Sequence, residues 1–225
     1  YLLTYFFLNH SNFHYLSFQW LPVMQKIGYR ADLDLVRCGY YPRGGGQISA
    51  KIEPVHQISS LQIANRGDLL EISGLSAASN LPLDIARRQR SRLVSRLGSR
   101  YRLSDIKCSD LPGFGKGTFM TAVIKFQETR AVFSSLGEKG KRAEIVADEL
   151  VDQVVKCHSG TAIWDPYLAD QILLPLCFAA QDSYLKPVII TSHLKTNAEV
   201  IKAFLPVEIE LSDQISSPGF LKIQV

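Results

Sequence analysis

The pattern of hydrophobic and polar positions begins with a helical repeat. Over residues 13–27 the apolar side chains recur at close to helical spacing, and Gly28 follows where many helices end in a left-handed turn. The pattern predicts a helix over 13–27, bent at Pro22. The preceding stretch, 1–8, is apolar but too short for a membrane helix, and we interpret it as an interior strand or the truncated start of a longer chain.

Two stretches of alternating apolar and polar residues follow. The alternation covers 31–35 and returns over 48–52, on the far side of a glycine-rich turn at 42–46. Because successive side chains of a strand point to opposite faces, this pattern predicts two half-buried strands. Their separation by a single turn predicts a hairpin.

The pattern of apolar and polar residues changes near residue 64, after a mixed polar stretch that we interpret as a linker. From there an alternating pattern predicts four strands and two helices, with the strands at 69–73, 101–107, 118–126 and 131–136 and the helices at 81–97 and 143–155. We interpret 64–162 as a small α/β domain inserted into a larger one, which is formed by 1–63 and 163–225.

The last segment predicts alternating helices and strands. The helix expected over 167–180 is apolar nearly all round, as a buried helix should be. It is followed by a strand at 188–190, a helix at 196–205 and strands at 207–211 and 220–225. Strands alternate with helices along the whole chain, which predicts the α/β (α+β) class.

Composition adds little to this picture. The chain is 46% hydrophobic and 20% charged, as expected of a soluble globular protein, and its net charge of +4 leans weakly toward a polyanionic partner such as nucleic acid. Five arginines concentrate in the helix expected over 81–97: Arg87, Arg88, Arg90, Arg92 and Arg96. Such a charge run is most simply a solvated face, and an RNA-facing surface is the alternative.

The cysteines and the lengths of the apolar runs bear on the cellular compartment and on membrane association. The four cysteines lie far apart without metal-ligand spacing, so we expect reduced thiols in a cytoplasmic protein and assign no metal ligands. No apolar run reaches the length of a membrane helix, and we expect no membrane partner.

Three groups of residues are candidates for chemistry. Gly44, Gly45 and Gly46, after Arg43, offer unhindered backbone N–H groups that could hold a phosphate, although a hairpin turn needs the same glycines. His193 follows a short strand and precedes Thr196-x-x-Glu199, a capping box expected to start the last helix. The positive end of that helix would favour a neutral, nucleophilic ring and attract phosphates. A structural hydrogen bond is the alternative role for His193.

An acid also lies within the apolar helix. Asp170 and its neighbour Gln171 interrupt the segment 167–180, and burying a carboxylate is costly unless it is paired. A histidine ring or a metal ion would be a suitable partner for Asp170. Exposure at one end of the helix is the alternative explanation.

Four of these segments resemble the RNA 3'-terminal phosphate cyclase family. They are Gly39-Tyr-Tyr-Pro-Arg-Gly-Gly-Gly46, Gly137-Glu-Lys-Gly140 with Ala143-Glu144, Tyr167-Leu-Ala-Asp-Gln171 and Ser192-His-Leu-Lys-Thr-Asn197. They occur in the family's order. The resemblance implies a large domain of repeated β-sheet and two-helix units, interrupted by a small α/β insert.

The resemblance also implies a reaction. His193 would attack the α-phosphate of ATP, with Mg²⁺ or Mn²⁺, and form a covalent histidine-AMP. AMP would pass to an RNA 3'-phosphate, and the vicinal 2'-hydroxyl would displace it and leave a 2',3'-cyclic phosphate. Asp170 would support His193. Tyr167 and Gln171, together with Asp170 and His193, would line the nucleotide pocket. Arg43 and Gly44–Gly46 would contact phosphate or RNA.

The start of the chain departs from the family pattern. Full-length relatives carry a further amino-terminal section with metal-binding and phosphate-binding residues, and none of these can be assigned here. A noncatalytic RNA-processing scaffold or an inactive fragment is therefore the alternative. An enolpyruvyl transferase, which shares the architecture, is disfavoured by His193 in its motif.

Overall fold

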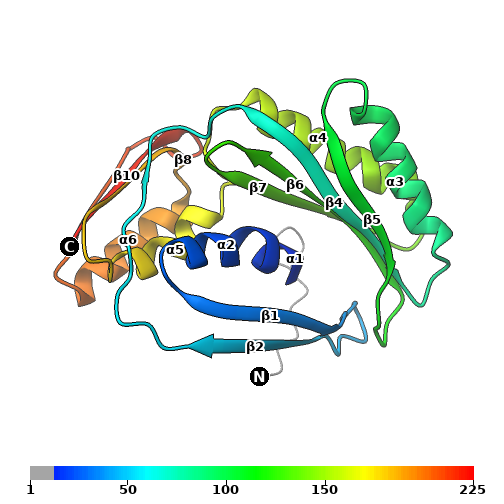
Figure 1. Ribbon diagram of the computed structural model, residues 1–225, viewed down its shortest axis with the longest axis horizontal. Helices are drawn as coiled ribbons and strands as arrows, with labels where there is room; N and C mark the ends of the chain where they lie inside the picture. Colours follow the sequence, from blue (N-terminus) through cyan, green and yellow to red (C-terminus); the bar gives the residue numbers. More distant parts are fainter. Residues whose placement is uncertain (1–12) are drawn as a thin grey trace.

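The computed structural model describes residues 13–225, and the apolar stretch 1–8 lies outside them. Within the described part, two four-stranded sheets each pack with two helices, and a separate hairpin of two strands lies below them in Figure 1. This mixture of sheets and helices confirms the predicted α/β class. No helix of residues 13–225 is long and apolar enough to cross a membrane.

The first helical segment is continuous but irregular. It consists of α1 (Phe13–Tyr15), a π-helical turn η1 (Leu16–Trp20) and α2 (Leu21–Lys26), and it ends at Gly28 with φ 102°. Pro22 has no N–H to donate to the carbonyl of Phe18, so the irregularity falls just before it. The Phe18 carbonyl instead accepts from Arg130 Nη1 at 3.5 Å, and Gln19 Nε2 donates to the Arg130 carbonyl at 3.0 Å. The break in the helix thus anchors it to the first sheet.

The predicted hairpin is confirmed. Strands β1 (Arg30–Arg37) and β2 (Gln47–Glu53) pair antiparallel, with Leu33 opposite Ala50. In Figure 1 the helical segment lies between this hairpin and β7 (Arg130–Leu136). The hairpin therefore faces the first sheet across the helix.

The first sheet has the strand order β5-β4-β6-β7 and confirms that the middle segment holds four strands and two helices, although the strand predicted over 69–73 continues to Ser79. Its remaining elements are β4 (Leu69–Ser79), β5 (Leu103–Asp110), β6 (Gly117–Phe126), α3 (Asp84–Leu97) and α4 (Ala143–Ser159). Only the β4–β5 pair is parallel. Ile72, Leu93, Met120, Ile124 and Leu150 are almost fully buried in the core between the sheet and the two helices.

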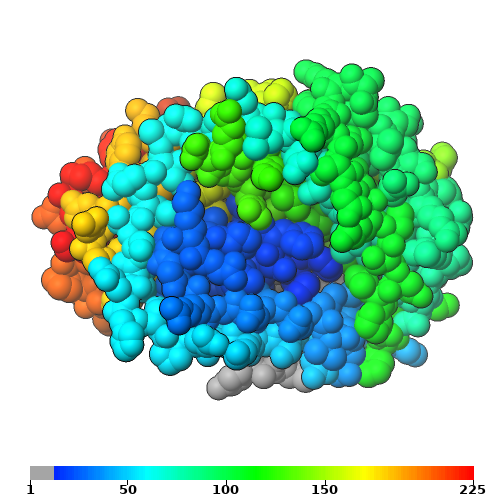
Figure 2. All heavy atoms as spheres, in the orientation of Figure 1, coloured from blue at the N-terminus to red at the C-terminus, as the bar shows by residue number. Residues whose placement is uncertain are grey.

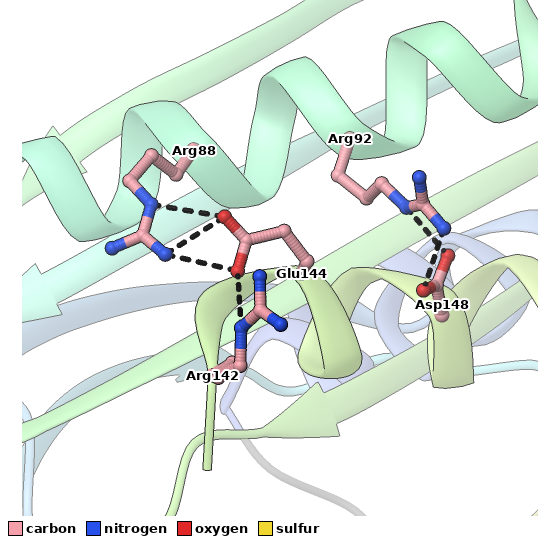
Figure 3. Close-up of polar contacts among 5 residues, drawn as sticks. All are labelled: Arg88, Arg92, Arg142, Glu144 and Asp148. Carbon is pink, nitrogen blue, oxygen red and sulfur yellow. Dashed lines mark hydrogen bonds and ion pairs between the residues drawn. The ribbon is translucent and has the colours of Figure 1, made fainter.

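Ion pairs join the two helices of this sheet (Figure 3). Arg88 of α3 donates twice to Glu144 Oε1 and once to Oε2, at 2.8 to 3.0 Å. Arg92 and Arg96 both donate to Asp148 of α4. Three of the five arginines of α3 thus contact α4, rather than forming a purely solvated face. The RNA-facing role of this helix stays a prediction.

The second sheet has the order β3-β8-β10-β9. Its elements are β3 (Gln62–Ile63), β8 (Ser183–Ile189), β9 (Glu208–Leu211), β10 (Pro218–Gln224), α5 (Leu168–Leu176) and α6 (Ser192–Phe204). The pairing of β3 with β8 is parallel, whereas β10 pairs antiparallel with both neighbours. The two-residue β3 was not predicted because it is too short to show an alternation.

Three sequence predictions in this region were wrong in their bounds. Helix α6 begins at Ser192, because the Thr191 hydroxyl accepts from the Leu194 N–H at 3.0 Å and caps it. The expected cap at Thr196 lies inside the helix instead. Strand β8 begins at Ser183 rather than 188. Helix α5 ends at Leu176, next to Pro175, and Leu174 is 49% exposed, so the helix is not buried all round.

The chain passes twice between the two sheets, and Arg66, in the first of these connections, forms a clamp by binding the second. Its guanidinium donates to four backbone carbonyls at the end of α4 and beyond it, those of Cys157, His158, Gly160 and Ala162, at 2.5 to 3.4 Å. It also lies over the Phe126 ring, 4.3 Å from the centroid. Separate hydrophobic cores lie on the two sides of this clamp. The proposed domain limits, 1–63, 64–162 and 163–225, stay predictions.

Candidate functional site

His193 lies in the first turn of α6. Its position follows from the cap residue Thr191, which lies two residues earlier, and the His193 side chain is exposed. Asn197 is one helical turn further along and so shares a face with His193. The Asn197 amide donates to Asp170 Oδ1 in the first turn of α5. The structure therefore brings Asp170 to the His193 face of α6 through Asn197.

A buried carboxylate fixes the start of α5. Asp165 is 4% exposed, and its Oδ1 accepts from the Tyr15 hydroxyl and from the Tyr167 N–H, both at 2.9 Å. Tyr167 is the residue that precedes α5, so this contact orients the helix that carries Asp170. Neither Asp165 nor Tyr15 was selected from the sequence. A lone Asp-Pro dipeptide reads as a turn, and its partner lies 150 residues away.

A cavity of about 740 Å³ lies beside these residues, between the hairpin and the first sheet. Its lining includes Tyr167 and Asp165 on one side and Gly44 and Gly46 on the other. The structure thus brings two of the predicted groups to one cavity. His193, Asp170, Gln171, Arg43 and Gly45 are not among the described residues that line it. Gln171 is half-buried within α5.

The glycine turn uses its glycines for its own conformation. Gly44 and Gly45 have φ values of 60° and 72°, which favour glycine. The Gly44 N–H donates to the Tyr40 carbonyl at 2.7 Å, and Arg37 Nε donates to the Gly45 carbonyl at 2.8 Å. These contacts account for the glycines as a hairpin turn. Their contact with phosphate stays a prediction.

Two buried ionisable groups line the cavity with opposite consequences for stability. Burial raises the pKa of Asp165 to about 6, despite the hydrogen bonds it accepts, and burial lowers the pKa of His14 to about 4. Between pH 4 and 6 the folded state therefore holds an extra proton on Asp165, and stability is lost as pH rises. Between about pH 4 and 6.5 the unfolded state holds an extra proton on His14, so stability is gained as pH rises through this range.

We expect the pH dependences of stability due to Asp165 and to His14 to oppose one another in the native protein. A variant that lacks one of the two groups should show the dependence due to the other. Each shift corresponds to about 3 kcal/mol at 1.36 kcal/mol per pKa unit. In Asp165→Asn the contribution of this pair to the unfolding free energy should rise with pH by about 3 kcal/mol between acid and neutral solution, because of the two buried groups only His14 remains. In His14→Gln it should fall by a similar amount. Urea unfolding across this pH range measures both, and parallel profiles for the two variants would contradict the assignment.

Metal-ligating side chains are not grouped in the described part of the chain. Across residues 13–225 no group of three His, Cys, Asp or Glu side chains is arranged to hold a metal ion. All four cysteines are free thiols.

The geometry defines an α/β protein of sheet and two-helix units, with an exposed histidine at the start of a helix, an arrangement that suits a phosphate-bearing ligand. The family description of the RNA 3'-terminal phosphate cyclases matches residues 9–211. The chain therefore belongs to the RNA 3'-terminal phosphate cyclase family.

The chain is similar to several proteins named RNA 3'-terminal phosphate cyclase. The protein of Pseudomonas fluorescens is 35% identical over 206 residues, which are 89% of this chain and 59% of the relative. That of Sulfurisphaera tokodaii is 36% identical over 205 residues, with the same two shares. That of Methanopyrus kandleri is 34% identical over 225 residues, 95% of this chain and 60% of the relative. The chain thus spans about three fifths of the length of these relatives.

Proposed function

We propose that this chain carries the nucleotidyl-transfer part of an RNA 3'-terminal phosphate cyclase. The observation that supports this most is the position of His193, exposed in the first turn of α6 and tied through Asn197 to Asp170. The names of the relatives supply the RNA 3'-phosphate as the substrate.

The residues of the chain have separate roles in this proposal. His193 is the nucleophile, and Asp170 holds Asn197 and with it the His193 face of α6. The backbone N–H groups of Ser192 and His193 at the start of α6 would bind phosphate oxygens, which suits ATP with Mg²⁺ or Mn²⁺ on its phosphates. Tyr167 and Gln171 line the nucleotide pocket. Arg43 and the glycines Gly44–Gly46 contact phosphate or RNA.

The reaction has two transfers. A ring nitrogen of His193 forms a bond to the α-phosphorus of ATP while the bond to the β-phosphate breaks and pyrophosphate leaves. An oxygen of the RNA 3'-phosphate then takes the adenylate from His193. The neighbouring 2'-hydroxyl loses its proton, attacks the 3'-phosphorus and displaces AMP, which leaves the 2',3'-cyclic phosphate.

The test is to incubate the chain with α-labelled ATP and magnesium and to examine the labelled protein. A phosphoramidate should be lost in acid and retained in base. Adding 3'-phosphorylated RNA should then release the label as AMP and produce a cyclic phosphate end. A folded chain without label would contradict the proposal and favour a noncatalytic RNA-processing role. Competition by unlabelled GTP would report the nucleotide preference.

A further inference from the structure

An exposed aromatic ring lies against the glycine turn and stacks with a cationic side chain. Phe114, in the loop between β5 and β6, is 56% exposed, and the guanidinium carbon of Arg37 lies 4.5 Å from its ring centroid. A Cβ on Gly45 would come within 2.7 Å of the ring, so only glycine allows the ring this position. The ring is therefore contacted by Arg37 and by the Gly45 backbone, while more than half of the Phe114 side chain stays exposed.

Two more cationic side chains lie beside this ring. A hollow of about 510 Å³ is lined by Phe114, Arg43, Lys116, Asn80 and Gly113, and no acidic side chain is among these lining residues. Arg43 Nη1 donates to the Phe114 carbonyl at 3.2 Å. Asn80 Nδ2 donates to the carbonyls of Gly113 and Gly115 at 2.6 and 3.0 Å. The loop that carries the ring is thus held by side chains from two other segments.

The turn separates this hollow from the large cavity. Gly44 and Gly46 line the cavity that Tyr167 also lines, whereas Arg43, the residue before them, lines the hollow. Figure 2 shows the blue hairpin meeting the green segment of the first sheet at this end of the molecule. The glycine turn therefore has the cavity on one side and the hollow on the other.

We propose that Phe114, Arg43 and Lys116 form a binding surface for single-stranded RNA upstream of the 3' end. A base stacks on the open face of Phe114, and Arg43 and Lys116 contact the adjoining phosphates. Stacking on an aromatic ring between cations is the usual means of holding single strands without reading their sequence. This inference rests on the proposed function for the RNA end, but the surface binds the strand and not the reacting phosphate.

The experiment measures the anisotropy of a short 5'-fluorescein oligouridylate, with a 3'-phosphate or a 3'-hydroxyl, on titration with the chain. Phe114→Ala and Phe114→Leu should each weaken binding of both strands by about tenfold, and Phe114→Trp should retain it. The matched control is Phe178→Ala, since Phe178 is also 56% exposed but lies after α5. Thermal unfolding checks that each variant is folded.

The salt dependence of RNA affinity reports on the phosphate contacts. Lys116→Ala should lower the slope of log affinity against log salt by about 0.7, as expected for one phosphate contact on a single strand. Lys107→Ala, an exposed lysine of β5, is the control and should not change it by the same amount. Duplex RNA should bind more weakly than the single strand, because its bases are not free to stack.

The outcomes separate this inference from the proposed function. Binding by Phe114→Leu equal to that of the native chain would overturn the stacking surface, even if His193 becomes labelled. Weaker RNA binding by Phe114→Ala, in a chain that never becomes labelled, would support the surface and contradict the nucleotidyl transfer. Equal losses in Phe114→Ala and Phe178→Ala would also overturn it.

Discussion

Replacing His193 with alanine is expected to abolish the labelled adduct completely. The proposed bond joins the α-phosphorus to a ring nitrogen of this residue, and alanine has no atom that could replace it. The exposed position of His193 in the first turn of α6 makes the change mild for the fold. Labelling with α-labelled ATP, followed by acid treatment, measures the result.

A matched variant distinguishes loss of the nucleophile from a general effect. His56→Ala removes an exposed histidine from the segment between β2 and β3 and should leave labelling unchanged. Retained label in His193→Ala would show that another group carries the nucleotide. Unfolding temperatures of both variants should match that of the native chain.

Replacing Arg66 with alanine is expected to destabilise the protein by about 3 kcal/mol, since hydrogen bonds from a charged donor contribute about 1.5 to 3 kcal/mol and the cation–π contact adds to them. The substitution leaves four carbonyls near the end of α4 without this donor. Lysine should restore only part of the loss, because an ammonium group cannot reproduce the planar donor set. Urea unfolding gives the free energy.

Arg100→Ala provides the comparison for this change. Arg100 also lies near an aromatic ring, 5.6 Å from the centroid of Tyr101, but its side chain is exposed. Its removal should cost well under 1 kcal/mol, as is usual for an exposed contact. Similar losses in Arg66→Ala and Arg100→Ala would mean that the clamp contributes little.

The sequence predicted the elements that carry a clear repeat. The hairpin shows alternation, and β6 and β7 are apolar-rich runs bounded by turn residues; the structure confirms these strands. The start of α6 was missed by four residues because two hydroxyl residues, Thr191 and Thr196, could each cap a helix. Only the folded chain shows that Thr191 accepts the bond.

Only some of the residues discussed above could be selected from the sequence, for a related reason. The positions of His193 and Asp170 follow from a local pattern and a family resemblance, whereas Asp165 and Arg66 are defined by partners distant in the sequence. Asn197 could have been found from its spacing of four residues from His193, which places both on one helical face. Its hydrogen bond to Asp170 depends on how α5 and α6 pack.

The pairing of β3 with β8 bears on the order in which the protein folds. The Leu61 N–H donates to the Ser183 hydroxyl, 122 residues later, and the strands beside them are parallel. During synthesis β3 must therefore wait for nearly the whole chain, while the intervening sheet can fold as soon as it emerges. Once folded, that sheet brings Arg66 to the end of α4 and shortens the loop that remains to be closed. We expect the docking of β3 on β8, which precedes the His193 helix, to be the last step.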